Sequence, residues 1–128
     1  MSLLLILALG AAEPALDCKD PFTQSEMNRC AYQDFLKADA ELNRVWKDVS
    51  ATMKAWDKDI DRSYDNAPTH FDTLLAGQRA WLTYRDEHCR LAGFQMRGGS
   101  AEPLVRESCR ASVTEARTRE LLEYVELR

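Results

Sequence analysis

Apolar residues recur at steps of three and four along three separate stretches of the chain. The first and longest stretch contains Met27, Ala31, Phe35, Ala38, Leu42, Val45, Val49, Met53 and Trp56. The second contains Phe71, Leu74, Leu75, Trp81, Leu82 and Cys89. The third and weakest contains Val105, Cys109, Val113, Ala116, Leu121, Leu122 and Val125. Because this period places apolar side chains on one face of an α-helix, the pattern predicts three amphipathic helices.

Residues of helix-capping type mark where these helices begin. A capping box is predicted at residues 23–26 (TQSE), and a second capping signal at residues 69–72 (THFD). The glycine pair at residues 98–99 ends the second helix, unless Gly93 ends it sooner, and Ser100 is placed to cap the third. Residues 57–68 are acidic, contain proline and carry no sustained apolar stripe, so we expect a connector there. Three long helices with short connections predict an all-α, up-down-up bundle.

The N-terminal segment has the composition of an export signal. Residues 3–12 (LLLILALGAA) are apolar, are too few to span a bilayer, and end in small residues that suit cleavage. We therefore expect a signal peptide over residues 1–12, or extending to residue 15, followed by one domain over residues 13–128. A buried N-terminal helix is the alternative, and the lack of Lys or Arg before the run leaves open a start further upstream. Asp17 directly before Cys18 disfavours a lipid anchor on that cysteine.

The four cysteines, Cys18, Cys30, Cys89 and Cys109, agree with export. An even number in a small chain with a signal-like start indicates disulfides, and four cysteines allow three pairings. We favour Cys18–Cys30 and Cys89–Cys109, because each is local and because the second pair lies about equally far on either side of the glycine turn. Antiparallel helices joined by that turn would place the two cysteines opposite one another. Zinc is the competing interpretation, but the sequence has neither C-x-x-C nor H-x-x-x-H spacing.

Arg85 stands on the apolar stripe of the second helix. An unpaired guanidinium in the core would be very costly, so a facing carboxylate is expected. Asp39 on the first helix is the best-placed partner, and Gln78 and Asn43 would complete a polar network inside the bundle. The alternative is that Arg85 lines a groove and binds the carboxylate of a ligand.

Asp57, Asp59, Asp61 and Asp65 make the connector acidic. Their spacing resembles the start of a calcium loop, but arginine and proline occupy the sixth and twelfth positions, where such a loop needs glycine and glutamate. A solvated acidic segment is the better interpretation. The four aspartates are therefore candidate contacts for a basic protein, since loops commonly carry recognition.

The charge balance and the scarcity of catalytic motifs narrow the range of functions. The net charge of −4 at pH 7 disfavours nucleic acid, whose phosphates require a basic surface, and favours a cationic partner. The two histidines, His70 and His88, belong to no recognisable nucleophile or metal motif, and bridged cysteines supply no thiolate. We expect no catalytic residue, no cofactor and no metal site, and hence a protein that is not an enzyme.

Several segments taken together resemble a known family. They are residues 26–31 (EMNRCA), 38–43 (ADAELN), 78–89 (QRAWLTYRDEHC) and 98–100 (GGS), and Cys109 followed by 114–118 (TEART). This combination, over roughly residues 18–122, resembles the LprI-like lysozyme-inhibitor N-terminal domain family. The W-x-x-Y-R-D-x-x-C block, with the later Gly-Gly-Ser and cysteine, is the most specific part.

The resemblance implies a small helical domain exported by bacteria, periplasmic or secreted, and for at least one type of member the inhibition of lysozyme. Two functions are considered. The first is a binding protein that occludes lysozyme or a similar cationic wall-degrading enzyme, through the four aspartates or the turn at 93–101. The second is a non-catalytic structural or accessory module of the cell envelope with another partner. In either case we expect no membrane anchor after signal removal.

Overall fold

The computed structural model describes residues 16–126, and the expected signal peptide with its cleavage point lies outside this range. The described chain forms three long helices and one short 3₁₀ helix, which are α1 (Gln24–Asp57), α2 (His70–Gly93), η1 (Phe94–Met96) and α3 (Glu102–Glu126). From residue 16 to residue 126 there is no strand. The predicted all-α fold of three long helices is confirmed.

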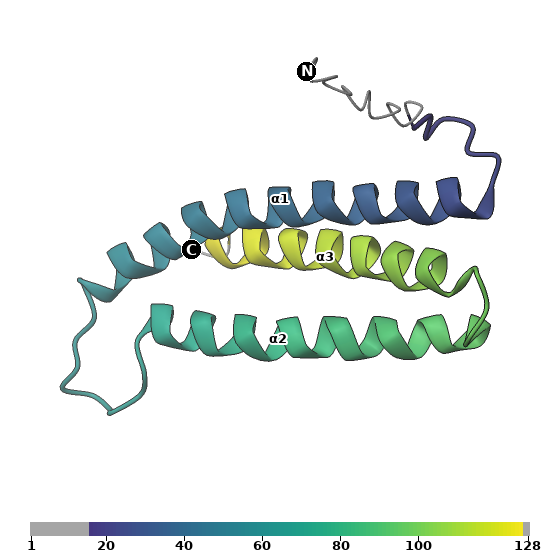
Figure 1. The fold of residues 1–128 in the computed structure, drawn as a ribbon. Coiled ribbons are helices and arrows are strands. Elements are labelled where there is room, and N and C mark those ends of the chain that lie inside the picture. The colour runs from purple at the N-terminus through teal and green to yellow at the C-terminus, as the bar shows by residue number, and fades with distance from the viewer. Residues whose placement is uncertain (1–15, 127–128) are drawn as a thin grey trace, which may run out of the picture.

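The three helices form an up-down-up bundle (Figure 1). α1 and α3 run in the same direction, and α2 runs in the opposite direction. α3 packs against both of the other helices, most extensively against α1, whereas α1 and α2 share a smaller contact. Among the described residues, no helix combines the length and the apolar character that crossing a membrane requires.

The predicted capping signals form hydrogen bonds at the starts of α1 and α2. Thr23 Oγ1 accepts from the N–H of Glu26 at 3.1 Å, and Glu26 Oε2 accepts from the N–H of Phe22 at 2.9 Å. Thr69 Oγ1 accepts from the N–H of Asp72 at 3.0 Å. The two threonines each satisfy an N–H that no helical carbonyl reaches, so both helices begin where the sequence predicts.

The larger apolar core lies in the half of the bundle nearest the α1–α2 connection. It consists of Leu42, Val45, Val49, Met53, Leu74 and Leu121. Partly buried side chains pack around it, namely Trp46, Trp56, Phe71, Trp81 and Val125. A smaller cluster contains Phe35, Ala38 and Ala111. Because burial of a valine or leucine side chain contributes about 1.5–3 kcal/mol, these clusters supply much of the stabilisation between the helices.

The buried face of α3 differs from the prediction. The predicted stripe through Val105, Cys109, Val113 and Ala116 is only half-buried. The residues that α3 buries most completely are Glu107, Ala111, Thr114, Arg117, Thr118 and Leu121. The prediction holds for Leu121, which is fully buried, and for Val125, which packs against the core. It is wrong for the first part of the stripe, because polar groups on the buried face have partners on α2 and within α3, and such pairing lowers the cost of burying them. Much of the interface made by α3 is therefore polar.

Two disulfides lie toward the end of the bundle opposite the α1–α2 connection. They are Cys18–Cys30 and Cys89–Cys109, the predicted pairing. The first attaches the segment before α1 to that helix, and the second joins α2 to α3 with Cα atoms 5.4 Å apart. One turn after Cys89, a Cβ atom at Gly93 would lie 3.3 Å from a side-chain atom of α3, so glycine permits the close approach of the two helices there.

The turn between α2 and α3 is fixed by a glycine and by α1. Gly98 has a φ of 76°, a left-handed conformation that glycine adopts without steric cost. Its N–H donates to Glu102 Oε2 at 2.9 Å. Asn28 Nδ2 on α1 donates to the carbonyl of Ser100 at 2.8 Å. Ser100, expected to cap α3, thus ties the turn to α1 through its backbone.

Loss of the Cys89–Cys109 bridge is expected to destabilise the bundle. Replacing both cysteines with alanine should lower the free energy of unfolding by about 3 kcal/mol, because the bridge restricts the unfolded chain across a sequence separation of 20. Urea unfolding of the oxidised proteins measures this change. Replacing Cys18 and Cys30 with alanine is the matched control, which should cost less because it releases only the segment before α1. An equal or larger loss in the control would contradict this expectation.

Candidate functional site

Arg85 lies at the centre of a buried network that joins the three helices. Its side chain is 6 % exposed, and Nη1 lies 3.4 Å from Asp39 Oδ1 on α1, the partner that the sequence predicts. The same nitrogen lies 3.4 Å from Thr114 Oγ1 on α3, and Nε donates to Asp86 Oδ1 on α2 at 3.0 Å. The Arg85 guanidinium thus contacts residues on all three helices, which is the arrangement expected of a core ion pair.

Aromatic rings and a second arginine complete this network. The Arg85 guanidinium carbon lies 5.0 Å from the ring centroid of Phe35 and 5.2 Å from that of Trp81. Arg110 lies over the same Phe35 ring at 3.7 Å, and its Nε is 3.4 Å from Asp86 Oδ1. Aromatic faces attract cations, so the rings help to compensate for the loss of water around the two arginines. The sequence predicted neither Arg110 nor Asp86 as part of the network.

Of the two residues predicted to complete a polar network inside the bundle, Gln78 takes part in a buried polar contact and Asn43 does not. Asn43 is exposed. Gln78 is buried, but its Oε1 accepts from Nε of Arg117 on α3 at 2.9 Å. The Arg117 side chain is 7 % exposed, and its Nη1 lies 3.4 Å from both Glu120 Oε2 and the hydroxyl of Tyr124. Sequence reasoning missed Arg117 because the predicted stripe of α3 ran through other positions.

Asp57, the last residue of α1, caps the start of α2. Oδ1 accepts from the N–H of His70 at 2.7 Å and lies 2.9 Å from His70 Nδ1, and Oδ2 accepts from the N–H of Phe71 at 3.0 Å. A carboxylate at a helix N-terminus is favoured by the unpaired N–H groups and by the helix dipole. Desolvation alone would raise the pKa of Asp57, but the hydrogen bonds from Phe71 and His70 outweigh the desolvation, so the pKa of Asp57 is lowered from its usual value. Asp57 thus joins the two helices that flank the connection. Its contact with a partner stays a prediction.

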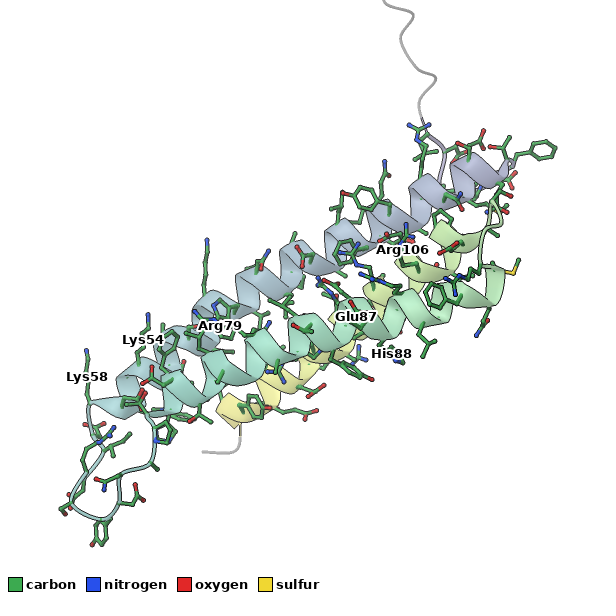
Figure 2. All side chains as sticks on the ribbon, turned by 60° about the horizontal axis from the view of Figure 1, so that its bottom comes forward. Lys54, Lys58, Arg79, Glu87, His88 and Arg106 are labelled. Atoms are coloured by element: carbon green, nitrogen blue, oxygen red, sulfur yellow. A yellow bond between two sulfur atoms is a disulfide. The ribbon has the colours of Figure 1, made fainter. Side chains whose placement is uncertain are left out.

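The segment from residue 58 to residue 69, called the connector below, extends beyond the helices at one end of the bundle (Figures 1 and 2). Asp61 Oδ1 accepts from the hydroxyl and the N–H of Ser63 at 2.6 and 2.9 Å, and these bonds lower the pKa of Asp61. Asp65 Oδ1 accepts from the N–H of Ala67 at 2.9 Å. Two of the predicted contact aspartates therefore also organise the connector, and Asp59, Asp61 and Asp65 are all exposed.

The charge at the connector end of the bundle is mixed. The negative charge of the three aspartates of the connector is partly offset by the positive charges of Lys58 and Arg62. The last two turns of α3 add Glu120, Glu123 and Glu126 at the same end of the bundle (Figure 1). Carboxylates remain in excess, but the connector alone is less acidic than its run of aspartates suggests.

A groove of about 600 Å³, called the connector groove below, lies beside the connector. Its walls come from four parts of the chain, with Met53 from α1, Leu74 and Gly77 from α2, Tyr124 from α3, and several residues of the connector. Arg117 also lines it, so the second buried arginine borders a mostly apolar groove. The volume lies in the range of ligand-binding pockets.

The remaining predicted candidates do not form a reactive site together. His70 pairs with Asp57, whereas the ring of His88 stacks on Tyr84 with centroids 5.2 Å apart. Figure 2 shows His88 on α2 far from the connector. In the described part of the chain, all cysteines are bridged and no group of three or more His, Cys, Asp or Glu side chains is arranged to hold a metal ion.

Replacement of Arg85 by methionine is expected to lower the free energy of unfolding by roughly 2–3 kcal/mol. Breaking a fully buried ion pair costs about 3–5 kcal/mol, but Asp39 and Asp86 are partly exposed and can regain water. Urea unfolding measures the change. Arg44→Met is the control, because it removes an exposed arginine paired with Glu41 and should alter stability little. A loss no larger than that of the control would show that the network contributes little.

Asp57→Asn is expected to destabilise the protein at neutral pH, with a deficit that shrinks in acid. Because the folded-state pKa is lowered, the ionised carboxylate stabilises the fold above the unfolded-state pKa of about 3.9, and this contribution is lost as the pH falls through the folded-state pKa. Thermal unfolding from neutral pH to about pH 2.5 measures it. Thr69→Ala removes a cap without a titrating group, so its cost of about 1 kcal/mol should not vary with pH. A deficit of Asp57→Asn that stays constant across the range would contradict the assignment.

Comparison of the sequence with known proteins identifies its family. Residues 18–121 match the family described as Lysozyme inhibitor LprI, a span that contains both disulfides, the Arg85 network and the connector. The chain is also 46 % identical over 120 residues to an uncharacterized protein of Rhizobium meliloti (strain 1021), which covers 91 % of this chain and 84 % of that protein. No solved structure gives a significant match. The protein belongs to the LprI lysozyme-inhibitor family.

Proposed function

We propose that this protein is exported, binds a lysozyme or a similar cationic wall-degrading enzyme, and inhibits it by occlusion. Membership of the LprI family supports the inhibitory role. The two disulfides support an oxidising compartment, the periplasm or the exterior of the cell. We place the contact surface on the projecting connector, because it presents exposed aspartates and an exposed tyrosine.

The connector suits the surface of a folded protein. Asp57 fixes its junction with α2, and the bonds of Asp61 and Asp65 shape it from within. A segment that is ordered before binding loses less conformational entropy in the complex. Tyr64 is 86 % exposed, and tyrosine is among the residues that contribute most to binding energy in interfaces. An ordered loop that presents this ring can enter a substrate cleft and exclude substrate from it.

Charge and aromatic contact are expected to contribute differently. Carboxylates at the connector end would attract a cationic enzyme and speed association, while Lys58 and Arg62 reduce that attraction. Tyr64 would act in the formed complex by covering apolar surface on the enzyme. We therefore assign the association rate mainly to Asp59 and Asp61, and the residence time mainly to Tyr64.

An accessory module of the cell envelope with another partner is the second candidate function. One observation favours it, namely the connector groove, which an inhibitor acting only through the connector does not need. The two candidates are separable, because occlusion of lysozyme depends on the outer surface of the connector and ligand binding depends on the groove beside it.

Lysis of a peptidoglycan suspension by lysozyme, with the purified protein titrated in at low and at physiological salt, tests the proposed inhibition. We expect stoichiometric inhibition that weakens with salt. Asp59→Lys combined with Asp61→Lys should weaken it by about tenfold at low salt through slower association. Tyr64→Ala should weaken it by about tenfold or more at either salt, with unchanged thermal stability because the side chain is exposed.

The matched control reverses two charges away from the connector. Asp34→Lys combined with Glu87→Lys makes the same change in net charge on α1 and α2, and Figure 2 shows Glu87 on α2 away from the connector. This variant should inhibit nearly as well as the wild type. Equal losses in both double variants would remove the connector from the proposed interface, and no inhibition of any of several lysozyme classes would reject the proposed function.

A further inference from the structure

Gly77 occupies a helical position that packing does not explain. It lies in the interior of α2, where glycine destabilises a helix relative to alanine. A Cβ atom there would meet no other atom within 4 Å, and among the described residues the glycine with positive φ is Gly98. Neither a close contact nor the backbone conformation therefore requires glycine at this position. Gly77 lines the connector groove, so its missing side chain leaves the groove open.

Arg117 lines the same groove, and one of its guanidinium nitrogens has no hydrogen-bond partner among residues 16–126. Its Nε donates to Gln78, and its Nη1 lies 3.4 Å from both Glu120 and Tyr124. Nη2 makes no hydrogen bond within residues 16–126, and it is not one of the buried atoms that lack a partner, so it keeps contact with solvent. Gln78 and the rings of Trp81 and Tyr124, at 6.0 and 5.8 Å, hold the guanidinium in place.

The contact between Arg117 and Glu120 is weak enough to be replaced. It is a single contact at 3.4 Å, and the Glu120 side chain is 54 % exposed, so its carboxylate can turn into water at little cost. A carboxylate that accepts from two nitrogens of a guanidinium forms a shorter and stronger pair. A ligand carboxylate in the groove can therefore bind Nη1 and Nη2 together, where Glu120 contacts Nη1 alone.

We propose that the connector groove binds a monocarboxylate that carries an apolar chain. The carboxylate pairs with Arg117, and the chain lies along the open surface of Gly77, against Met53 and Leu74. Most of the lining is apolar and favours an aliphatic body. Asp65 also lines the groove, but it is exposed to water and its Oδ1 accepts from the N–H of Ala67, whereas the guanidinium of Arg117 is buried. The guanidinium therefore favours a negatively charged group over a neutral or positive one. This ligand site goes beyond the proposed inhibition and does not depend on it.

Isothermal titration of the full oxidised chain with octanoate tests this site. The alcohol 1-octanol and the base octylamine are comparison probes, because they have the same chain without the negative charge. We expect octanoate to bind about tenfold or more tightly than octanol, because octanol has no charge to pair with Arg117. Octylamine, which carries a positive charge, should bind more weakly still. Equal affinities for octanoate and octanol, or no binding of octanoate at millimolar concentration, would overturn the proposal.

Gly77→Leu tests the position of the chain without changing any charge. A Cβ atom at position 77 meets no other atom within 4 Å, and leucine favours a helix more than glycine does, so the variant should be at least as stable as the wild type in thermal unfolding. Its affinity for octanoate should fall by about tenfold or more, because the leucine occupies the volume that the ligand needs. Unchanged affinity in this folded variant would place octanoate outside the groove and overturn the proposal.

Glu120→Gln tests the position of the carboxylate. Removing the competing charge should tighten octanoate binding by about threefold or more, because Glu120 is the anionic partner of Arg117 among residues 16–126. Glu87→Gln makes the same change at a residue of α2 that does not line the groove and that lies away from the connector in Figure 2, and it should leave the affinity unchanged. Equal effects of the two variants would show that only net charge matters, and would remove Arg117 from the proposed site.

Discussion

The buried guanidinium of Arg85 is the interaction on which the packing of the three helices depends. A buried cation requires partners, and Arg85 has Asp39 on α1, Asp86 on α2 and Thr114 on α3. No helix can shift along another without breaking one of these contacts. Arg117 adds a second link, from α3 to Gln78 on α2. The apolar clusters supply stabilisation that tolerates small shifts, whereas these directional contacts specify one alignment.

The two ends of the bundle are held by different forces, and this difference locates the binding features. At one end the Cys89–Cys109 bridge, the close approach at Gly93 and the bond from Asn28 to Ser100 hold the helices and their turn together. At the other end hydrogen bonds from α2 to Asp57 join α1 to α2, and the connector projects beyond them. The connector and the groove beside it both lie at this second end. Its outer surface offers charge and an aromatic ring to a protein, while the groove offers apolar walls and a guanidinium to a small acid.

The sequence by itself determined the features that depend on neighbouring residues or on burial alone. The three helices follow from the period of the apolar residues, and the starts of α1 and α2 follow from threonines whose hydroxyls bond an N–H three residues later. The disulfides follow from short separations and from the glycine turn between Cys89 and Cys109. Asp39 follows as a partner of Arg85 because a charge on a buried stripe needs a counter-charge on the facing helix.

Only the tertiary structure decided the features that depend on distant segments meeting. The polar face of α3 is buried because α2 supplies hydrogen-bond partners such as Gln78. The pattern of polar and apolar residues in α3 does not reveal that these partners exist. Asp57 caps α2 because the connector turns back and brings the first N–H groups of α2, 13 and 14 positions further along the chain, against the Asp57 carboxylate. The groove is a space between four segments, so no single stretch of sequence encodes it. Local periodicity and capping act within a few residues, whereas burial, pairing and cavities arise only when helices pack.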